Sequence, residues 1–104
     1  MMSLNNNLFL PGKVLYNSFD IDFERPFAEQ LEELNEDLIQ VEYNEKYILD
    51  IGWYPEHNAN GNIIIQLIFD NQWDTPIVKE KVNNIDSLLK IIKEIQIFLL
   101  SKTN

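Results

Sequence analysis

The sequence predicts an α+β domain with two helices packed on one face of a four-stranded antiparallel meander. Three observations lead to this class. Apolar residues alternate with polar ones over two segments between residues 39 and 54 and are followed by an apolar segment and a charged one, polar turns separate these four segments, and helical spacing of apolar residues occurs before and after them. The chain has 104 residues, of which 45% are hydrophobic, so we expect a single domain (residues 1–104) with one core.

The first part of the chain predicts little regular structure. Residues 1–17 contain an Asn triplet and Pro11-Gly12, so we expect a loosely held lead-in with at most a short element around residues 14–16. Residues 19–24 then alternate between apolar and acidic side chains, which indicates a strand or extended segment with one buried face. Asp20, Asp22 and Glu24 would share its solvent side.

Residues 26–38 predict the first helix. Pro26 suits the first helical position, and apolar residues follow at spacings of four, three and four from Phe27 to Leu38. The opposite face carries acids without Lys or Arg, and each like-charge pair at i,i+4 costs an isolated helix about a few tenths of a kcal/mol. Since stability alone would favour interspersed lysines, we expect this face to contact a partner. Its members are Glu29, Glu32, Glu33, Glu36 and Asp37.

The centre of the chain predicts the four strands. The period of two begins at Ile39, and Asn44-Glu45 has the form of a tight hairpin turn between residues 39–43 and 46–54. A polar loop at 56–61 leads to the apolar run 62–69, typical of a central strand. After a second connection at 70–76, residues 77–82 carry the charged side chains of an exposed edge.

The last element is a helix from a cap at Asn83 or Asn84 to about Leu100. Its second half is apolar nearly all round, which favours burial against the sheet. The alternative is an exposed patch for self-association or for a partner. The core stripe is predicted to consist of Ile85, Leu88, Ile92, Ile95 and Leu99, and it is widened by Leu89, Ile91, Ile97, Phe98 and Leu100.

Charge is unevenly distributed along the sequence. Residues 20–45 hold ten carboxylates and Arg25, which gives −9 and equals the formal net charge of the whole chain. Such a field repels nucleic acid and anionic membranes, and it speeds the encounter with a basic protein surface. The alternative is that the acids serve solubility alone. No apolar run is long enough to span a membrane, and the first residues do not resemble a signal peptide, so we expect a cytoplasmic protein.

The sequence offers little for catalysis. Cysteine is absent, the single histidine, His57, has no Ser partner nearby, and the three glycines form no phosphate-binding loop. Asp20, Asp22 and Glu24 could bring carboxylates to a cation, but no ligand loop surrounds them, so a solvated acidic edge is favoured. We therefore expect no enzyme activity, no cofactor and no metal site.

Aromatic residues beside acids are typical of protein interfaces. Tyr54, at the end of the second predicted strand, and Trp73, in the connection after the third, are the best anchors for a partner. Trp53 shares the alternation of the core residues and is expected to be buried. Asp20, Asp22, Tyr54 and Trp73 are thus secondary candidates beside the acidic helix face.

The stretches 37–43, 47–56, 60–61 and 70–76 resemble small bacterial immunity proteins of contact-dependent growth inhibition systems, over about residues 30–97. The most specific string is Asp50-Ile51-Gly52-Trp53-Tyr54-Pro55-Glu56. The resemblance implies a cognate toxin C-terminal domain, commonly a nuclease, which is neutralised in the cytoplasm. A regulatory or adaptor subunit without catalytic activity, using the apolar end of the last helix, is the alternative, and a small metal enzyme is a third reading.

Overall fold

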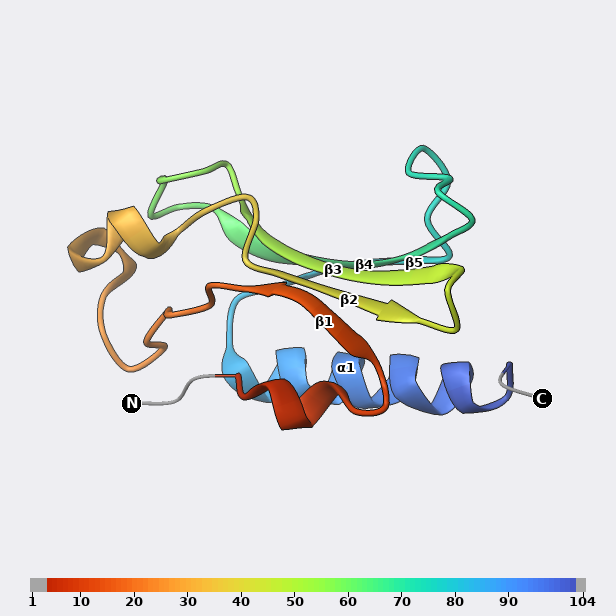
Figure 1. The fold of residues 1–104 in the computed structure, drawn as a ribbon. Coiled ribbons are helices and arrows are strands. Elements are labelled where there is room, and N and C mark those ends of the chain that lie inside the picture. The colour runs from red at the N-terminus through yellow and green to blue at the C-terminus, as the bar shows by residue number, and fades with distance from the viewer. Residues whose placement is uncertain (1–3, 103–104) are drawn as a thin grey trace.

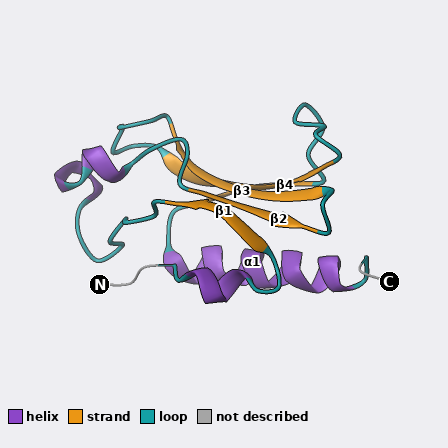
Figure 2. Cartoon of the chain, in the orientation of Figure 1, coloured by secondary structure: helices purple, strands orange, loops and turns teal. Residues whose placement is uncertain are grey.

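The computed structural model describes residues 4–102, which form one antiparallel sheet with one α-helix lying along one face (Figures 1 and 2). The strands follow one another across the sheet in chain order. They are β1 (Lys13–Asn17), β2 (Ile39–Tyr43), β3 (Tyr47–Tyr54), β4 (Asn62–Phe69) and β5 (Val78–Val82), and the helix is α1 (Ile85–Leu100). The α+β class and the antiparallel meander are confirmed. The prediction of four strands and two helices was wrong, because five strands and one α-helix are present among the described residues.

The fifth strand comes from the segment expected to be a loosely held lead-in. Residues 4–17 supply the 3-10 helix η1 (Asn6–Phe9) and β1, which is bulged between Val14 and Tyr16 where it pairs with β2. Phe9 is fully buried, and its carbonyl oxygen accepts a hydrogen bond of 2.7 Å from the Tyr43 hydroxyl. Leu4 and Phe9 of this segment are buried in the core, and Leu8 and Val14 pack against it.

The predicted helix over residues 26–38 does not form. Two 3-10 turns, η2 (Phe27–Glu29) and η3 (Leu31–Glu33), are followed by an extended stretch that bonds to β3 through Asn35 and Leu38. Gln30 interrupts the helix with φ −139° and ψ 38°. The spacing of four, three and four therefore arises from two turns and an extended segment. Leu34 and Leu38 are fully buried, whereas Leu31 is exposed. The like-charge pairs that a helix would have stacked at i,i+4 are also relieved.

Residues 19–24 do not form a strand, and the expected alternation of burial holds only in part, because Asp22 and Phe23 are both half-buried. Ile21 is fully buried, Phe19 is nearly so, and Asp20 and Glu24 are exposed. Phe19 begins a chain of aromatic contacts that runs through Phe23 and Phe27 to the fully buried Trp53. These aromatic contacts anchor the irregular segment 19–27 to the end of the sheet.

The three predicted strands from 39 to 69 are present with unbroken register. Asn44 and Glu45 both have positive φ, as a tight hairpin turn of type I′ requires. Alternate residues of β2, β3 and β4 face α1 and form the core, whereas Gln40, Asp50 and Gln66 face the other way and lie opposite one another across these strands. The fourth predicted strand also forms, as β5, and it lies at one edge of the sheet.

Helix α1 begins as predicted. The Asn84 side chain accepts a hydrogen bond of 2.8 Å from the Ser87 backbone N–H, which is an N-cap. Four of the five predicted stripe residues are buried, and Ile85 is half-buried. The wide apolar face of the second half is only partly covered, because Ile97 and Leu100 are each 60% exposed. Among residues 4–102, no helix combines the length and the apolarity needed to span a bilayer.

Candidate functional site

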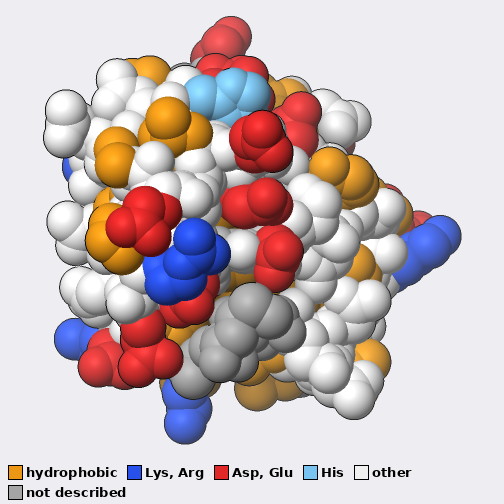
Figure 3. All heavy atoms as spheres, turned by 90° about the vertical axis from the view of Figure 1, so that its left-hand side faces the viewer, with side chains coloured by type: hydrophobic (Ala, Val, Ile, Leu, Met, Phe, Trp, Pro, Cys, Tyr) orange, Lys and Arg blue, Asp and Glu red, His pale blue; other side chains and the backbone are white. Residues whose placement is uncertain are grey.

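The predicted contact acids gather at one end of the molecule, although they do not share a helix. Figure 3 views this end, where carboxylates are spread across the surface and basic groups lie mainly near the outline. We call it the acidic end. It comprises Arg25 and the nine carboxylates that structural contacts group together, which belong to Asp20, Asp22, Glu24, Glu29, Glu32, Glu33, Glu36, Asp37 and Glu56.

A surface hollow of about 460 Å³ brings together five of the nine predicted contact residues. Arg25 lies in the same hollow and approaches Glu29 at 3.9 Å, with both side chains largely exposed. This is the only ion pair among residues 4–102, and an exposed pair of this length contributes about 0–1 kcal/mol. The carboxylates of the hollow are therefore almost uncompensated. They belong to Asp20, Asp22, Glu29, Glu32 and Glu33.

Gln30 holds this hollow in shape. Its side chain is only 6% exposed, and its carbonyl oxygen accepts a hydrogen bond of 2.8 Å from the Asp22 backbone N–H. Its amide donates to the carbonyl oxygen of Asp22 at 2.8 Å, and at longer distances to those of Arg25 and Pro26. One side chain thus takes the place of a regular backbone ladder. A buried glutamine between acids gives no sequence signal of this role, and sequence analysis missed it.

Glu36 lies on the other side of the acidic end, where the connection between β3 and β4 holds it. Its backbone N–H donates to a Glu56 carboxylate oxygen at 3.1 Å. The side-chain oxygen of the preceding Asn35 accepts a 2.9 Å hydrogen bond from Nε2 of the His57 ring, and the His57 backbone N–H donates to the Leu34 carbonyl oxygen at 2.7 Å. These bonds join residues that are about twenty positions apart, so the acidic end is held by two chain segments. Glu56 was not among the predicted contacts, although it belongs to this group.

Tyr54 is half-buried and lies in the negative field of this side. Burial raises the pKa of its hydroxyl, and nearby carboxylates raise it further, Asp50 first and then Glu36, Asp37 and Glu56. The hydroxyl therefore stays protonated and can donate a hydrogen bond. A protonated phenol ringed by carboxylates is suited to contact a cationic or hydrogen-bond accepting group.

Asp50 is a titratable group in the middle of the sheet, on the face away from α1, and is only 3% exposed. Gln40 donates to one carboxylate oxygen at 3.0 Å and Gln66 donates to the other at 3.3 Å. Burial raises the pKa of Asp50, the two amide bonds oppose that effect, and the charge of Asp37 adds to it. This group links the centre of the sheet electrostatically to the acidic end.

Trp73 lies apart from the other predicted contacts. It is 44% exposed in the connection between β4 and β5, which leaves the sheet at the end opposite to residues 27–33 (Figure 1). A single docking face can therefore include the acids and Tyr54 together, whereas Trp73 lies away from them. Among residues 4–102, no three His, Asp or Glu side chains are placed to hold one metal ion.

An apolar hollow of about 250 Å³ lies where η1 meets the end of α1. Leu10 is 64% exposed beside it, and Pro11, Gln96 and Leu99 line it together with Leu100. This is the position at which the last helix was considered as an interaction surface.

Comparison of the chain with protein-family models, curated proteins and solved structures gives no significant match. Residues 4–102 thus form an α+β domain with a five-stranded antiparallel meander, one α-helix and an acidic end that is almost uncompensated.

Proposed function

We propose that this protein is an immunity protein that binds and neutralises a cognate nuclease toxin domain through its acidic end. The single observation that carries the proposal is the concentration of nine carboxylates against one arginine, with one long ion pair among the described residues. A nuclease that grips phosphate presents a basic face. A complementary acidic surface accelerates the encounter and selects for that face.

The rigidity of the acidic end supports this role. Gln30 and the bonds from Glu56 and His57 fix the backbone that carries the acids. A surface that is held before binding loses less conformational entropy when the partner arrives. Tyr54 adds an aromatic ring with a protonated hydroxyl beside the acids, in keeping with its predicted part as an anchor.

The test begins with the gene directly upstream, which the proposal expects to encode a large secreted toxin, and uses the C-terminal domain of that protein. Coexpression of this chain should restore the growth of cells that make that domain, and the purified pair should bind with an association rate that falls steeply with salt. A neighbouring gene that encodes no toxin, or a toxin that kills with this chain present, refutes the proposal.

Charge reversal then locates the interface. The pair Glu32→Lys and Asp37→Lys should slow association about tenfold or more at low salt, with a smaller effect on dissociation. The control pair Glu45→Lys and Asp74→Lys changes the net charge equally at exposed positions in turns at the other end of the sheet. If both pairs slow association equally, only the net charge matters and the acidic end is not the interface.

A regulatory or adaptor subunit is the second candidate. It rests on the apolar hollow beside Leu10 and on Ile97, which is 60% exposed on α1. Self-association through the end of α1 belongs to the same reading. The test is sedimentation at high protein concentration. If this protein and its Ile97→Lys variant both sediment as monomers, self-association through α1 is contradicted.

A further inference from the structure

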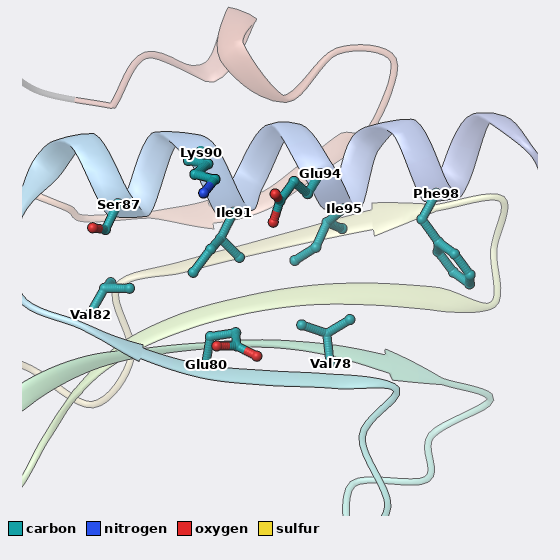
Figure 4. A pocket seen from close by; sticks show the side chains of 9 residues that line it. All are labelled: Val78, Glu80, Val82, Ser87, Lys90, Ile91, Glu94, Ile95 and Phe98. Atoms are coloured by element: carbon teal, nitrogen blue, oxygen red, sulfur yellow. The ribbon is translucent and has the colours of Figure 1, made fainter.

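A second surface lies on the opposite flank of α1 from η1. A hollow of about 540 Å³ separates the helix from β5, and Figure 4 shows the side chains of the two elements pointing toward one another across it. Val78, Ile91 and Phe98 are half-buried in its wall. Charged groups from both elements, Glu80, Lys90 and Glu94, complete the lining with Ser87, Val82 and Ile95.

The two flanks of α1 are covered differently. On one flank Gln96 donates a 2.7 Å hydrogen bond to the Leu8 carbonyl oxygen, so residues of the η1 segment close over the helix. On the other flank the hollow is lined by β5 and α1 alone. A chain segment lying beside β5 would complete this flank as η1 completes the first.

Strand β5 is suited to receive such a segment. It pairs with β4 in regular register over its full length, and no described strand pairs with its other edge. The opposite edge of the sheet, β1, is interrupted by its bulge, a feature that hinders the addition of a strand. A free, regular edge beside a hollow is the arrangement that binds an extended peptide by strand addition.

The charges of β5 determine which segment fits. Val78, Glu80 and Val82 face α1 and the hollow, so the residues that alternate with them, Lys79 and Lys81, point to the other face of the sheet, where the charge of β5 is purely basic. Residues 79–104 hold five lysines and three acids, in contrast to the acidic end. An added strand would place alternate side chains beside the two lysines and the intervening ones over the hollow.

We propose that β5 binds an extended segment of a partner protein in which carboxylate and apolar side chains alternate. The carboxylates lie beside Lys79 and Lys81, and the apolar side chains extend over the hollow toward Ile91 and Phe98. This surface is separate from the acidic end, so it does not depend on the proposed function.

A second copy of this chain fits the edge poorly. If two β5 strands paired about a two-fold axis normal to the sheet, side chains facing away from α1 would oppose one another. In β5 these are Lys79 and Lys81, so lysine would oppose lysine in each register that overlaps them. Like charges directly opposite one another destabilise a strand pair.

The test is a titration of the isotope-labelled full chain with a short capped peptide that alternates glutamate and valine. We expect slower amide exchange in β5 and shifted resonances for Ile91 and Phe98. A peptide with lysine in place of glutamate should bind about tenfold more weakly, since several cross-strand charge pairs change from attractive to repulsive. The pair Lys79→Glu and Lys81→Glu should invert that preference, whereas Lys46→Glu with Lys93→Glu, an equal charge change at exposed positions outside the hollow, should not.

Three results would overturn the proposal. In the first, neither peptide protects β5. In the second, both peptides bind the original chain equally. In the third, β5 amides are protected without peptide in a concentration-dependent dimer, which would assign the edge to a second copy.

Discussion

Removing the Gln30 side chain tests whether one buried amide organises the acidic end. Gln30→Ala deletes four hydrogen bonds, of which the two to the Asp22 backbone are 2.8 Å long. Each good hydrogen bond contributes about 1 kcal/mol net, and buried backbone groups left unpaired add a further cost. The free energy of unfolding should therefore fall by about 2–4 kcal/mol. The free energy of unfolding of a domain of this size is about 5–15 kcal/mol, so the variant should remain folded.

The assay is urea denaturation combined with amide hydrogen exchange. The free energy of unfolding should fall by the stated amount, and exchange should accelerate at Asp22 and Arg25 more than in β3 or β4. Gln30→Glu keeps the size of the side chain but its carboxylate cannot donate, so it should be at least as destabilising at neutral pH and should recover on acidification. Gln72→Ala removes an exposed glutamine and serves as the control. A loss below about 0.5 kcal/mol for Gln30→Ala would refute the reasoning, because exposed substitutions reach that size.

Three further predictions follow from buried contacts. Because burial raises the pKa of Asp50, the folded protein retains this proton at pH values where the unfolded chain has lost it, and stability falls as the pH rises from the unfolded pKa to the folded one. Asp50→Asn should therefore gain stability relative to the original chain as the pH rises above about 3.9, the ordinary pKa of Asp, and a parallel pH dependence in urea titrations would contradict this. Gly52→Ala places a Cβ against the Glu36 carbonyl oxygen and should cost about 1–3 kcal/mol, with accelerated exchange at Glu36; an unchanged midpoint would show that the segment yields freely. Tyr43→Phe removes the hydroxyl that bonds to Phe9 and should cost about 1–3 kcal/mol, with proteolysis accelerated in residues 4–17; equal proteolysis of both proteins would show that this bond does not hold the segment.

The sequence predicted those elements in which local pattern and tertiary burial agree. In β2 the burial alternates because one face packs on α1, the apolar segments of β3 and β4 form the centre of the sheet, and the Asn84 cap marks the helix start through its own side chain. The Asn44-Glu45 turn was recognisable because it separates two alternating segments and because Asn44 tolerates positive φ. In each case the signal lies within a few residues of the structure it determines.

The prediction of a helix over residues 26–38 was wrong because the interactions that determine this segment come from residues outside it. The bonds of Gln30 to Asp22, and of Asn35 and Leu38 to β3, replace the ladder of a helix, and apolar spacing contains no trace of them. Similarly, β1 depends on Tyr43 and Gln96, which reach the η1 segment from positions far along the chain. The acids at the site could still be chosen from composition, because an uncompensated charge run stays on the surface whichever local structure it adopts. Their grouping with Glu56 could not be predicted.

The order of the elements along the chain has a consequence for synthesis. α1 follows all five strands, so a ribosome releases the complete meander before the helix that shields its apolar side has been made. Until Ile92 and Leu99 emerge, that side of the nascent sheet has no cover from α1, and chains halted there should be prone to aggregate or to engage chaperones. Productive folding of this domain is therefore tied to the arrival of its final helix.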